Sequence, residues 1–192
     1  MAGERVFHLD VLSVKLNEDF KLAFEEPLDC PPEVSSAAMK ILKDRDREAV
    51  VVFNLNAAGI PASAHVASVG TLNSSLAHPR ELLKASILSN TNSIIIGHNH
   101  PSGSTEPSKE DIELTRRMTK LCSLIQIPLV DHVIIAGGNS CKYFSMFEKG
   151  IIKRASNGET YVDEKYLSQV AERSFNYGTK VHERRTAHSK VR

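Results

Sequence analysis

Two histidines, a serine and an aspartate lie close together in HNHPSGSTEPSKED, the segment that spans residues 98–111. His98 and His100 end an apolar run, and a turn rich in Pro, Gly and Ser separates them from Ser108 and Asp111. Residues i and i+2 of a strand point to the same side with α-carbons about 6.5 Å apart, so both imidazoles can reach one metal ion. The carboxylate of Asp111 adds an oxygen ligand and leaves a position open for water. This pattern indicates one zinc ion held by two histidines and one carboxylate.

The same residues also fit a simpler role at the start of a helix. Ser108 and Asp111 have the S-x-x-D spacing of a capping box, with Ser108 as the N-cap residue. Capping accounts for these two residues but not for the two histidines immediately before them. Because capping does not prevent a carboxylate oxygen from binding metal, both interpretations stay open.

The elements that must position these side chains follow from the hydrophobic pattern. Alternating or continuous apolar runs predict strands over residues 5–16, 49–55, 63–70, 93–100 and 127–138. Helical spacing predicts helices over residues 32–44, 78–90 with Pro79 at the first position, and 108–126. The short loop between the second and third strands favours an antiparallel pair. Strands alternating with helices predict an α/β sandwich with a largely buried sheet, at whose strand ends ligands usually bind.

Length and charge suggest one domain with two extensions. The chain has 192 residues, of which 41% are hydrophobic, and a net charge of +1. Residues 1–150 carry 15 basic and 18 acidic side chains, whereas residues 151–192 carry 9 basic and 5 acidic ones. We expect an N-terminal strand and linker (1–31), a metal-binding domain (32–150) and a polar, basic tail (151–192), with a short helix over 161–174 and disorder towards the end. The tail fits either a solvated terminus or a contact with nucleic acid or a repair complex.

The cysteines and the termini point to a cytoplasmic protein. Cys30, Cys122 and Cys141 are odd in number and far apart, as expected for reduced thiols. No apolar run reaches the ~18 residues of a membrane span, and the N-terminus has no apolar signal segment. We therefore expect no membrane contact.

The spacing H-x-H, seven residues, Ser, two residues, Asp resembles the JAMM motif of JAB/MPN-type metalloproteases and isopeptidases. Together with VGTLNSSLAHPRELLKASI upstream and DHVIIAGG and YFSMFEKG downstream, HNHPSG resembles the RadC branch of that superfamily. The resemblance covers residues 48–150 and implies a single-domain, cytidine-deaminase-like three-layer sandwich with a mixed central sheet. Asn99 stands between the histidines, where the eukaryotic deubiquitinating members usually carry Ser or Thr.

The resemblance also implies a mechanism. It places a catalytic glutamate where the first helix meets the first central strand, which is Glu48 in this chain. Zinc held by His98, His100 and Asp111 would lower the pKa of its water to about 7. Glu48 takes up the water's proton and passes it to the leaving amine, while Ser108 donates a hydrogen bond to the oxyanion. The expected reaction is hydrolysis of an amide or isopeptide bond in a peptide or protein.

Rival functions differ in the residues they require. In HNH nucleases the three letters are dispersed over tens of residues, whereas here they are adjacent. A zinc nucleobase deaminase requires a P-C-x-x-C pair that this chain lacks. The alternative function is an accessory DNA repair or recombination module of RadC type, often associated with mobile elements, with a structural metal. Three further histidines stay outside the predicted metal site: His65, His78 as a residue that fixes a helix start, and His132 as either a packed residue or a residue behind a ligand.

Overall fold

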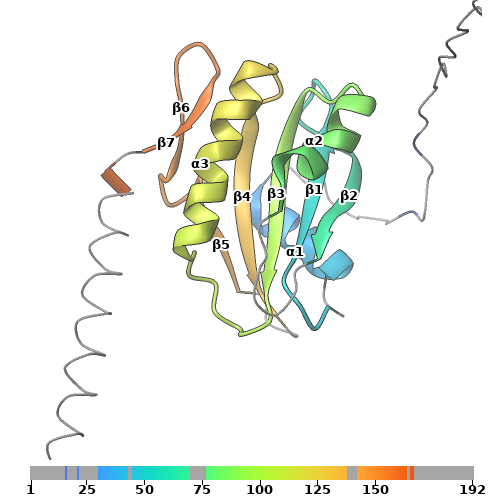
Figure 1. Ribbon diagram of the computed structural model, residues 1–192, viewed down its shortest axis with the longest axis vertical. Helices are drawn as coiled ribbons and strands as arrows, with labels where there is room; N and C mark the ends of the chain where they lie inside the picture. The colour runs from blue at the N-terminus through green and yellow to red at the C-terminus, as the bar shows by residue number, and fades with distance from the viewer. Residues whose placement is uncertain are drawn as a thin grey trace, which may run out of the picture.

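A five-stranded sheet forms the middle of the molecule (Figure 1), with the strand order β2-β1-β3-β4-β5. The computed structural model describes residues 16, 21, 30–42, 45–69, 77–137, 142–163 and 165–166. The sheet strands are β1 (Ala49–Leu55), β2 (Pro61–Val69), β3 (Ser93–His100), β4 (Leu129–Ala136) and β5 (Tyr143–Ser145). β3 and β4 are parallel, and the other neighbouring pairs are antiparallel. The sheet is therefore mixed, with its one parallel pair at the strand that carries the two histidines.

Helices cover both faces of this sheet. The helices are α1 (Pro31–Leu42), α2 (Pro79–Leu88) and α3 (Lys109–Leu124). α2 and α3 lie on the near face in Figure 1, where Leu82 and Met118 pack against Val52 and Ile96. α1 covers the far face, where a second core forms around Phe53. The three layers confirm the predicted α/β sandwich.

Strand alternation distributes the side chains of β1 and β3 between the two cores. Every residue of both strands is buried, because both strands have neighbours on each side and helices on both faces. Ile94 and Ile96 face α2 and α3, whereas Ile95 faces α1. By the same alternation, His98 and His100 belong to the α3 face and Asn99 to the α1 face.

One glycine permits close packing between α1 and the sheet. A β-carbon at Gly97 would lie 2.8 Å from Val51 Cγ1 and 3.0 Å from Ala38 Cβ. Both distances are below van der Waals contact, so any side chain here would separate α1 from β1 and β3. Gly97 thus keeps α1 near the strand that ends in the two histidines.

The C-terminal part of the described chain differs from the sequence prediction. β6 (Ile152–Arg154) and β7 (Thr160–Val162) form a separate antiparallel hairpin beside α3 (Figure 1). The helix predicted over residues 161–174 is wrong at its start, because Tyr161 and Val162 belong to β7. Val162 packs in the core with α3, so tertiary burial outweighs local helix propensity there. β5 to β7 have three residues each, too few to produce a recognisable alternation.

Two further predictions stay untested. The strand over residues 5–16, apart from residue 16, and residues 167–192 of the basic tail lie outside the described residues. The division at residues 31 and 150 also stays a prediction.

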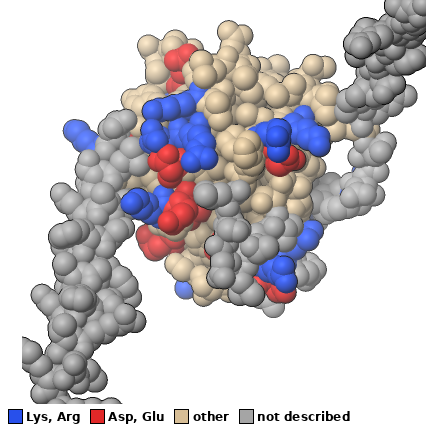
Figure 2. Space-filling view, in the orientation of Figure 1, with Lys and Arg blue, Asp and Glu red and all other residues tan. Residues whose placement is uncertain are grey.

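Across the segments that the structure describes, no helix has both the length and the apolar character needed to cross a bilayer. On the face formed by α2 and α3, basic and acidic side chains are interspersed (Figure 2).

Candidate metal centre

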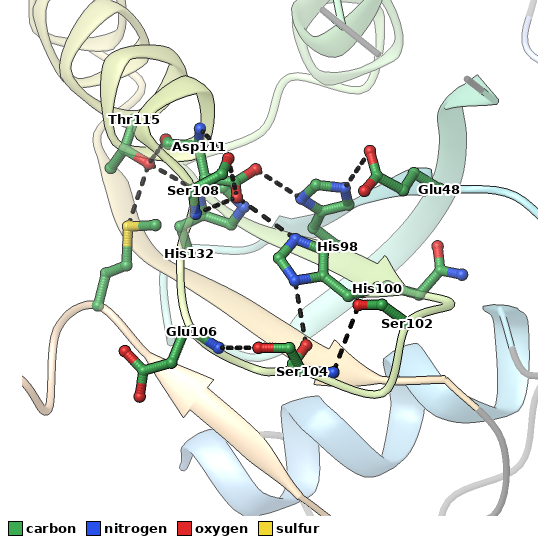
Figure 3. Close-up of polar contacts among 12 residues, drawn as sticks. Glu48, His98, His100, Ser102, Ser104, Glu106, Ser108, Asp111, Thr115 and His132 are labelled. Atoms are coloured by element: carbon green, nitrogen blue, oxygen red, sulfur yellow. Dashed lines mark hydrogen bonds and ion pairs between the residues drawn. The ribbon is translucent and has the colours of Figure 1, made fainter. Parts of the chain in front are cut away.

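The two histidines end β3 at the edge of the sheet from which α3 begins. The two residues are 3% and 7% exposed, and their ring centroids lie 4.8 Å apart. Because β3 and β4 are parallel, the chain must cross back over the sheet between them, and α3 makes that crossing. The turn of residues 101–108 reverses the chain, so that the first turn of α3 faces His98 and His100 (Figure 3).

The start of α3 is a complete capping box. The Asp111 amide donates to Ser108 Oγ at 3.1 Å, and the Ser108 amide donates to Asp111 Oδ2 at 2.8 Å. Ser108 Oγ also donates to Asp111 Oδ2 at 2.6 Å. The capping interpretation of Ser108 and Asp111 is therefore confirmed.

Capping leaves the Asp111 carboxylate in contact with both histidines. Asp111 Oδ1 lies 3.0 Å from His98 Nδ1, and Asp111 Oδ2 lies 3.3 Å from His100 Nε2. The carboxylate thus serves the helix with one oxygen and faces the two imidazoles with both. The structure brings together the three residues predicted to bind zinc.

Glu48 approaches His98 from the other side of its ring (Figure 3). Val50 pairs with His98 in the antiparallel register of β1 and β3. Glu48, two residues before Val50, therefore lies beside His100 and on the same face of the sheet. Glu48 Oε2 lies 3.9 Å from His98 Nε2, and its side chain is 42% exposed. Glu48 is therefore the carboxylate at the solvent rim of the site, and Asp111 is the buried one.

Three ligand atoms of this cluster are close enough to share an ion. One atom each from Glu48, His98 and His100 lie within 4.8 Å of one another. This trio differs from the predicted ligand set, in which Asp111 completes the site and Glu48 moves protons. Asp111 nevertheless touches both histidines, so the cluster offers two nitrogen donors and two carboxylates.

The titration behaviour of the cluster reflects these contacts. Burial alone would raise the pKa of Asp111, but its interactions with His100 and His98 outweigh burial and hold that pKa well below its usual range. Burial alone would lower the pKa of His100, but the hydrogen bond and charge of Asp111 raise it instead. Asp111 is therefore an ionised carboxylate, the form that binds a metal ion.

The ring nitrogens of His98 show that the cluster suits a cation. Both are buried, and neither has a hydrogen-bond partner of good geometry among the described residues. Buried polar atoms normally have partners, and two such nitrogens that face carboxylate oxygens can share a cation with them. His100 Nδ1 lies 3.1 Å from the carbonyl oxygen of Ser104, which can accept its proton and leave Nε2 for a metal. Two imidazoles and carboxylate oxygens form a donor set suited to zinc.

His132 packs behind His98, as the sequence predicted. Its ring stacks on that of His98 at 6.1 Å, and complete burial, followed by the charge of His98, lowers its pKa to about 3. His132 Nδ1 lies 2.7 Å from Thr115 Oγ1, whose hydroxyl donates to the Asp111 carbonyl oxygen at 2.6 Å. The neutral ring of His132 therefore donates from Nδ1 and links β4 to the first turns of α3.

The remaining histidines play other parts. His78 Nδ1 accepts a hydrogen bond from the Arg80 amide at 3.1 Å and caps α2, with Pro79 in the first turn as predicted. His65 lies on β2, where burial lowers its pKa. Neither belongs to the described metal cluster.

Sequence reasoning gave no role to Asn99. It is 2% exposed, its Oδ1 accepts from the Ala49 amide at 2.6 Å, and its Nδ2 donates to the Arg47 carbonyl oxygen at 3.1 Å. Asn99 is a polar residue within an apolar strand predicted to be buried, and this signal could have shown that its side chain needs hydrogen-bond partners.

Comparison with known proteins agrees with this geometry. The family model of the RadC-like JAB domain matches residues 28–151. The chain belongs to the RadC-like JAB family. This finding confirms the resemblance seen in the sequence, and the mixed sheet with its three helices is consistent with a JAB fold.

Curated relatives share the domain but carry names that describe no activity. A UPF0758 protein of Staphylococcus haemolyticus is 41% identical over 148 residues, which are 77% of this chain and 59% of that protein. UPF0758 proteins of Desulforamulus reducens and Clostridium botulinum are 44% and 45% identical over 64% and 69% of this chain. These alignments cover 53% and 57% of the two relatives. The RadC-like chain thus spans little more than half the length of these relatives.

Proposed function

We propose that this RadC-like chain is a zinc-dependent hydrolase that cleaves an amide or isopeptide bond in a peptide or protein. The observation that carries the proposal is the buried pair of His98 and His100, set between one buried and one rim carboxylate, in which both ring nitrogens of His98 lack a hydrogen-bond partner of good geometry among the described residues. The rim position of Glu48 supports its assignment to proton transfer, because a substrate arrives from solvent. The burial of Asp111 and its contacts with both histidines support its assignment as a ligand.

Each residue then has a defined task. His98, His100 and Asp111 would hold the zinc ion, which would supply a bound water of pKa about 7 and polarise the carbonyl group. Glu48 accepts the proton of the attacking water at a carboxylate oxygen and gives it to the nitrogen of the leaving amine. The Ser104 carbonyl fixes the tautomer of His100 by accepting the proton on Nδ1.

Ser108 has two tasks in this proposal. In the structure its hydroxyl donates to Asp111 Oδ2 at 2.6 Å and orients that carboxylate. The predicted hydrogen bond to an oxyanion requires the hydroxyl to turn away from Asp111. The backbone cap, in which the Ser108 amide donates to Asp111 Oδ2, is unaffected by that rotation.

Zinc content tests the ligand set. Wild type, His100→Ala, Asp111→Ala and Glu48→Gln are loaded with zinc, dialysed and measured by elemental mass spectrometry, with circular dichroism to verify folding. His78→Ala is the matched control, because it removes a histidine that caps α2 outside the site. We expect one zinc per chain in wild type, Glu48→Gln and His78→Ala, and loss in the other two. A wild type that takes up no zinc would overturn the proposal.

Hydrolysis tests the reaction itself. A library of peptides is incubated with zinc-loaded protein and cleavage products are identified by mass spectrometry. We expect wild type to cleave part of the library and Glu48→Gln, with its zinc retained, to lose that cleavage. Full cleavage by zinc-loaded Glu48→Gln would show that the role given to Glu48 is wrong.

A further inference from the structure

The two hydrogen bonds of Asn99 end on either side of Glu48. Asn99 Oδ1 accepts from the amide of Ala49, the residue after Glu48, at 2.6 Å. Asn99 Nδ2 donates to the carbonyl oxygen of Arg47, the residue before it, at 3.1 Å. One buried carboxamide thus holds the backbone on both sides of the rim carboxylate.

This contact extends the connection between β1 and β3 beyond their paired residues. The register of the two strands ends at the pair Val50 and His98, whereas β3 continues to His100. Strand alternation turns the Asn99 side chain away from the two histidines. It reaches instead the backbone of residues 47–49, at the start of the neighbouring strand β1. Asn99 therefore ties the segment around Glu48 to the strand that carries both histidines.

We infer that Asn99 is a positioning residue that holds Glu48 at its place beside His98 and His100. Glu48 Oε2 lies 3.9 Å from His98 Nε2, and the backbone that carries this side chain is bound by Asn99 on both sides. The catalytic consequence of this inference rests on the proposed hydrolytic function, whereas the contact between Asn99 and the backbone on both sides of Glu48 is independent of it.

The chemistry of the contact selects asparagine. A carboxamide offers one donor and one acceptor at the same distance from the backbone, as the Arg47 carbonyl and the Ala49 amide require. An aspartate keeps the acceptor but places a second oxygen against the Arg47 carbonyl. A serine has one oxygen on a shorter side chain and cannot replace both bonds.

Amide exchange tests the contact without a substrate. Exchange of the Ala49 amide is measured by nuclear magnetic resonance in wild type, Asn99→Ala and Asn99→Asp. The matched control is Asn54→Ala, which removes a 3%-exposed asparagine of β1 that bonds to Ser63 and Ser86. We expect the Ala49 amide to exchange at least about tenfold faster in Asn99→Ala than in Asn54→Ala, once rates are corrected for global stability. Asn99→Asp, which keeps the acceptor, should retain most of the protection.

Kinetics test the consequence for catalysis, on a peptide that the wild type cleaves and with equal zinc content in every variant. Asn99→Ala and Asn99→Asp should both lower kcat, on the order of 10²-fold for a displacement of about 1 Å, and leave KM unchanged. The double variant Glu48→Gln/Asn99→Ala should be no slower than Glu48→Gln alone, because Asn99 acts through Glu48. Asn54→Ala should keep the wild-type kcat.

Three results would overturn the inference: equal Ala49 exchange in Asn99→Ala and Asn54→Ala, a kcat unchanged by Asn99→Ala, or additive losses in the double variant. If the wild type binds zinc but cleaves no peptide, the proposed function fails on its own. In that case the exchange measurement alone decides whether Asn99 fixes the Glu48 backbone.

Discussion

Substitution of Ser108 and Asp111 separates their capping role from metal binding. Ser108→Ala removes the acceptor of the Asp111 amide, and loss of an N-cap costs about 1 kcal/mol. Asp111→Asn keeps the amide that Ser108 caps and an oxygen that can accept from the Ser108 amide, but it removes the charge that faces both histidines. The first variant should therefore lose the same stability with and without zinc, whereas the second should lose the increase in stability that zinc provides.

The sizes follow from linkage. Zinc at a hundred times its Kd stabilises the folded protein by about 2.7 kcal/mol, and a hundredfold weaker site retains about 0.4 kcal/mol of this. For a chain of this length about 1 kcal/mol corresponds to about 2–4 °C in Tm, so zinc should raise the wild-type Tm by about 5–11 °C. Asp111→Asn should show an increase of about 1–2 °C, whereas Ser108→Ala should start about 2–4 °C lower and keep most of the wild-type increase.

The assay is thermal unfolding followed by circular dichroism, with chelator and with zinc at one fixed concentration. His78→Ala serves again as control, since its effect should be equal in both conditions. A full zinc-dependent increase in Asp111→Asn would refute the reasoning and leave Asp111 as a capping residue alone.

Further predictions concern the packing around the site. Gly97→Ala should lower the free energy of unfolding in urea by about 1–3 kcal/mol, because its methyl group overlaps Val51; unchanged stability would contradict the close approach of α1. Burial raises the pKa of Cys122 to about 12, so its thiol should resist iodoacetamide at pH 9 until the protein unfolds. The free energy of unfolding should fall as the pH rises above about 9, because the thiol ionises there only in the unfolded chain. Modification of Cys122 in the folded protein at that pH would show that the thiol is accessible. Asp131→Ala should cost about 3 kcal/mol, because it strands the Ser145 hydroxyl and two backbone amides; a loss below 1 kcal/mol in urea unfolding would indicate that water replaces them.

The long helices and strands could be predicted from the sequence because the spacing of apolar residues along each one is typical of a single type of element. The apolar run AVVVFNL coincides with β1 at residues 49–55, and SIIIGHNH coincides with β3 at residues 93–100. Pro79 begins α2, and Ser108 caps α3. Each of these signals lies within a few residues of the element it specifies.

The site required information that local pattern does not contain. Glu48 lies fifty residues before His98, and their proximity depends on the antiparallel register of β1 and β3. The family resemblance, and not the spacing, therefore identified Glu48. The hydrogen bonds of Asn99 depend on the same register of β1 and β3. Their partners are the Ala49 amide and the Arg47 carbonyl oxygen, and because every residue has such backbone groups, the sequence does not indicate these contacts.

The unequal burial of the four site residues has a consequence for how this family can diverge. His98 and His100 lie on a strand buried along its whole length, so replacing either one disturbs the packing that holds the sheet together. Glu48 precedes β1 and is 42% exposed, so its replacement leaves the core intact. Under the proposed function, a descendant that gave up hydrolysis but kept the domain would change first at Glu48 and retain both histidines. On that proposal, an intact H-x-H motif among relatives would mark shared ancestry, and the residue at the position of Glu48 would distinguish domains able to carry out the proposed reaction from domains unable to do so.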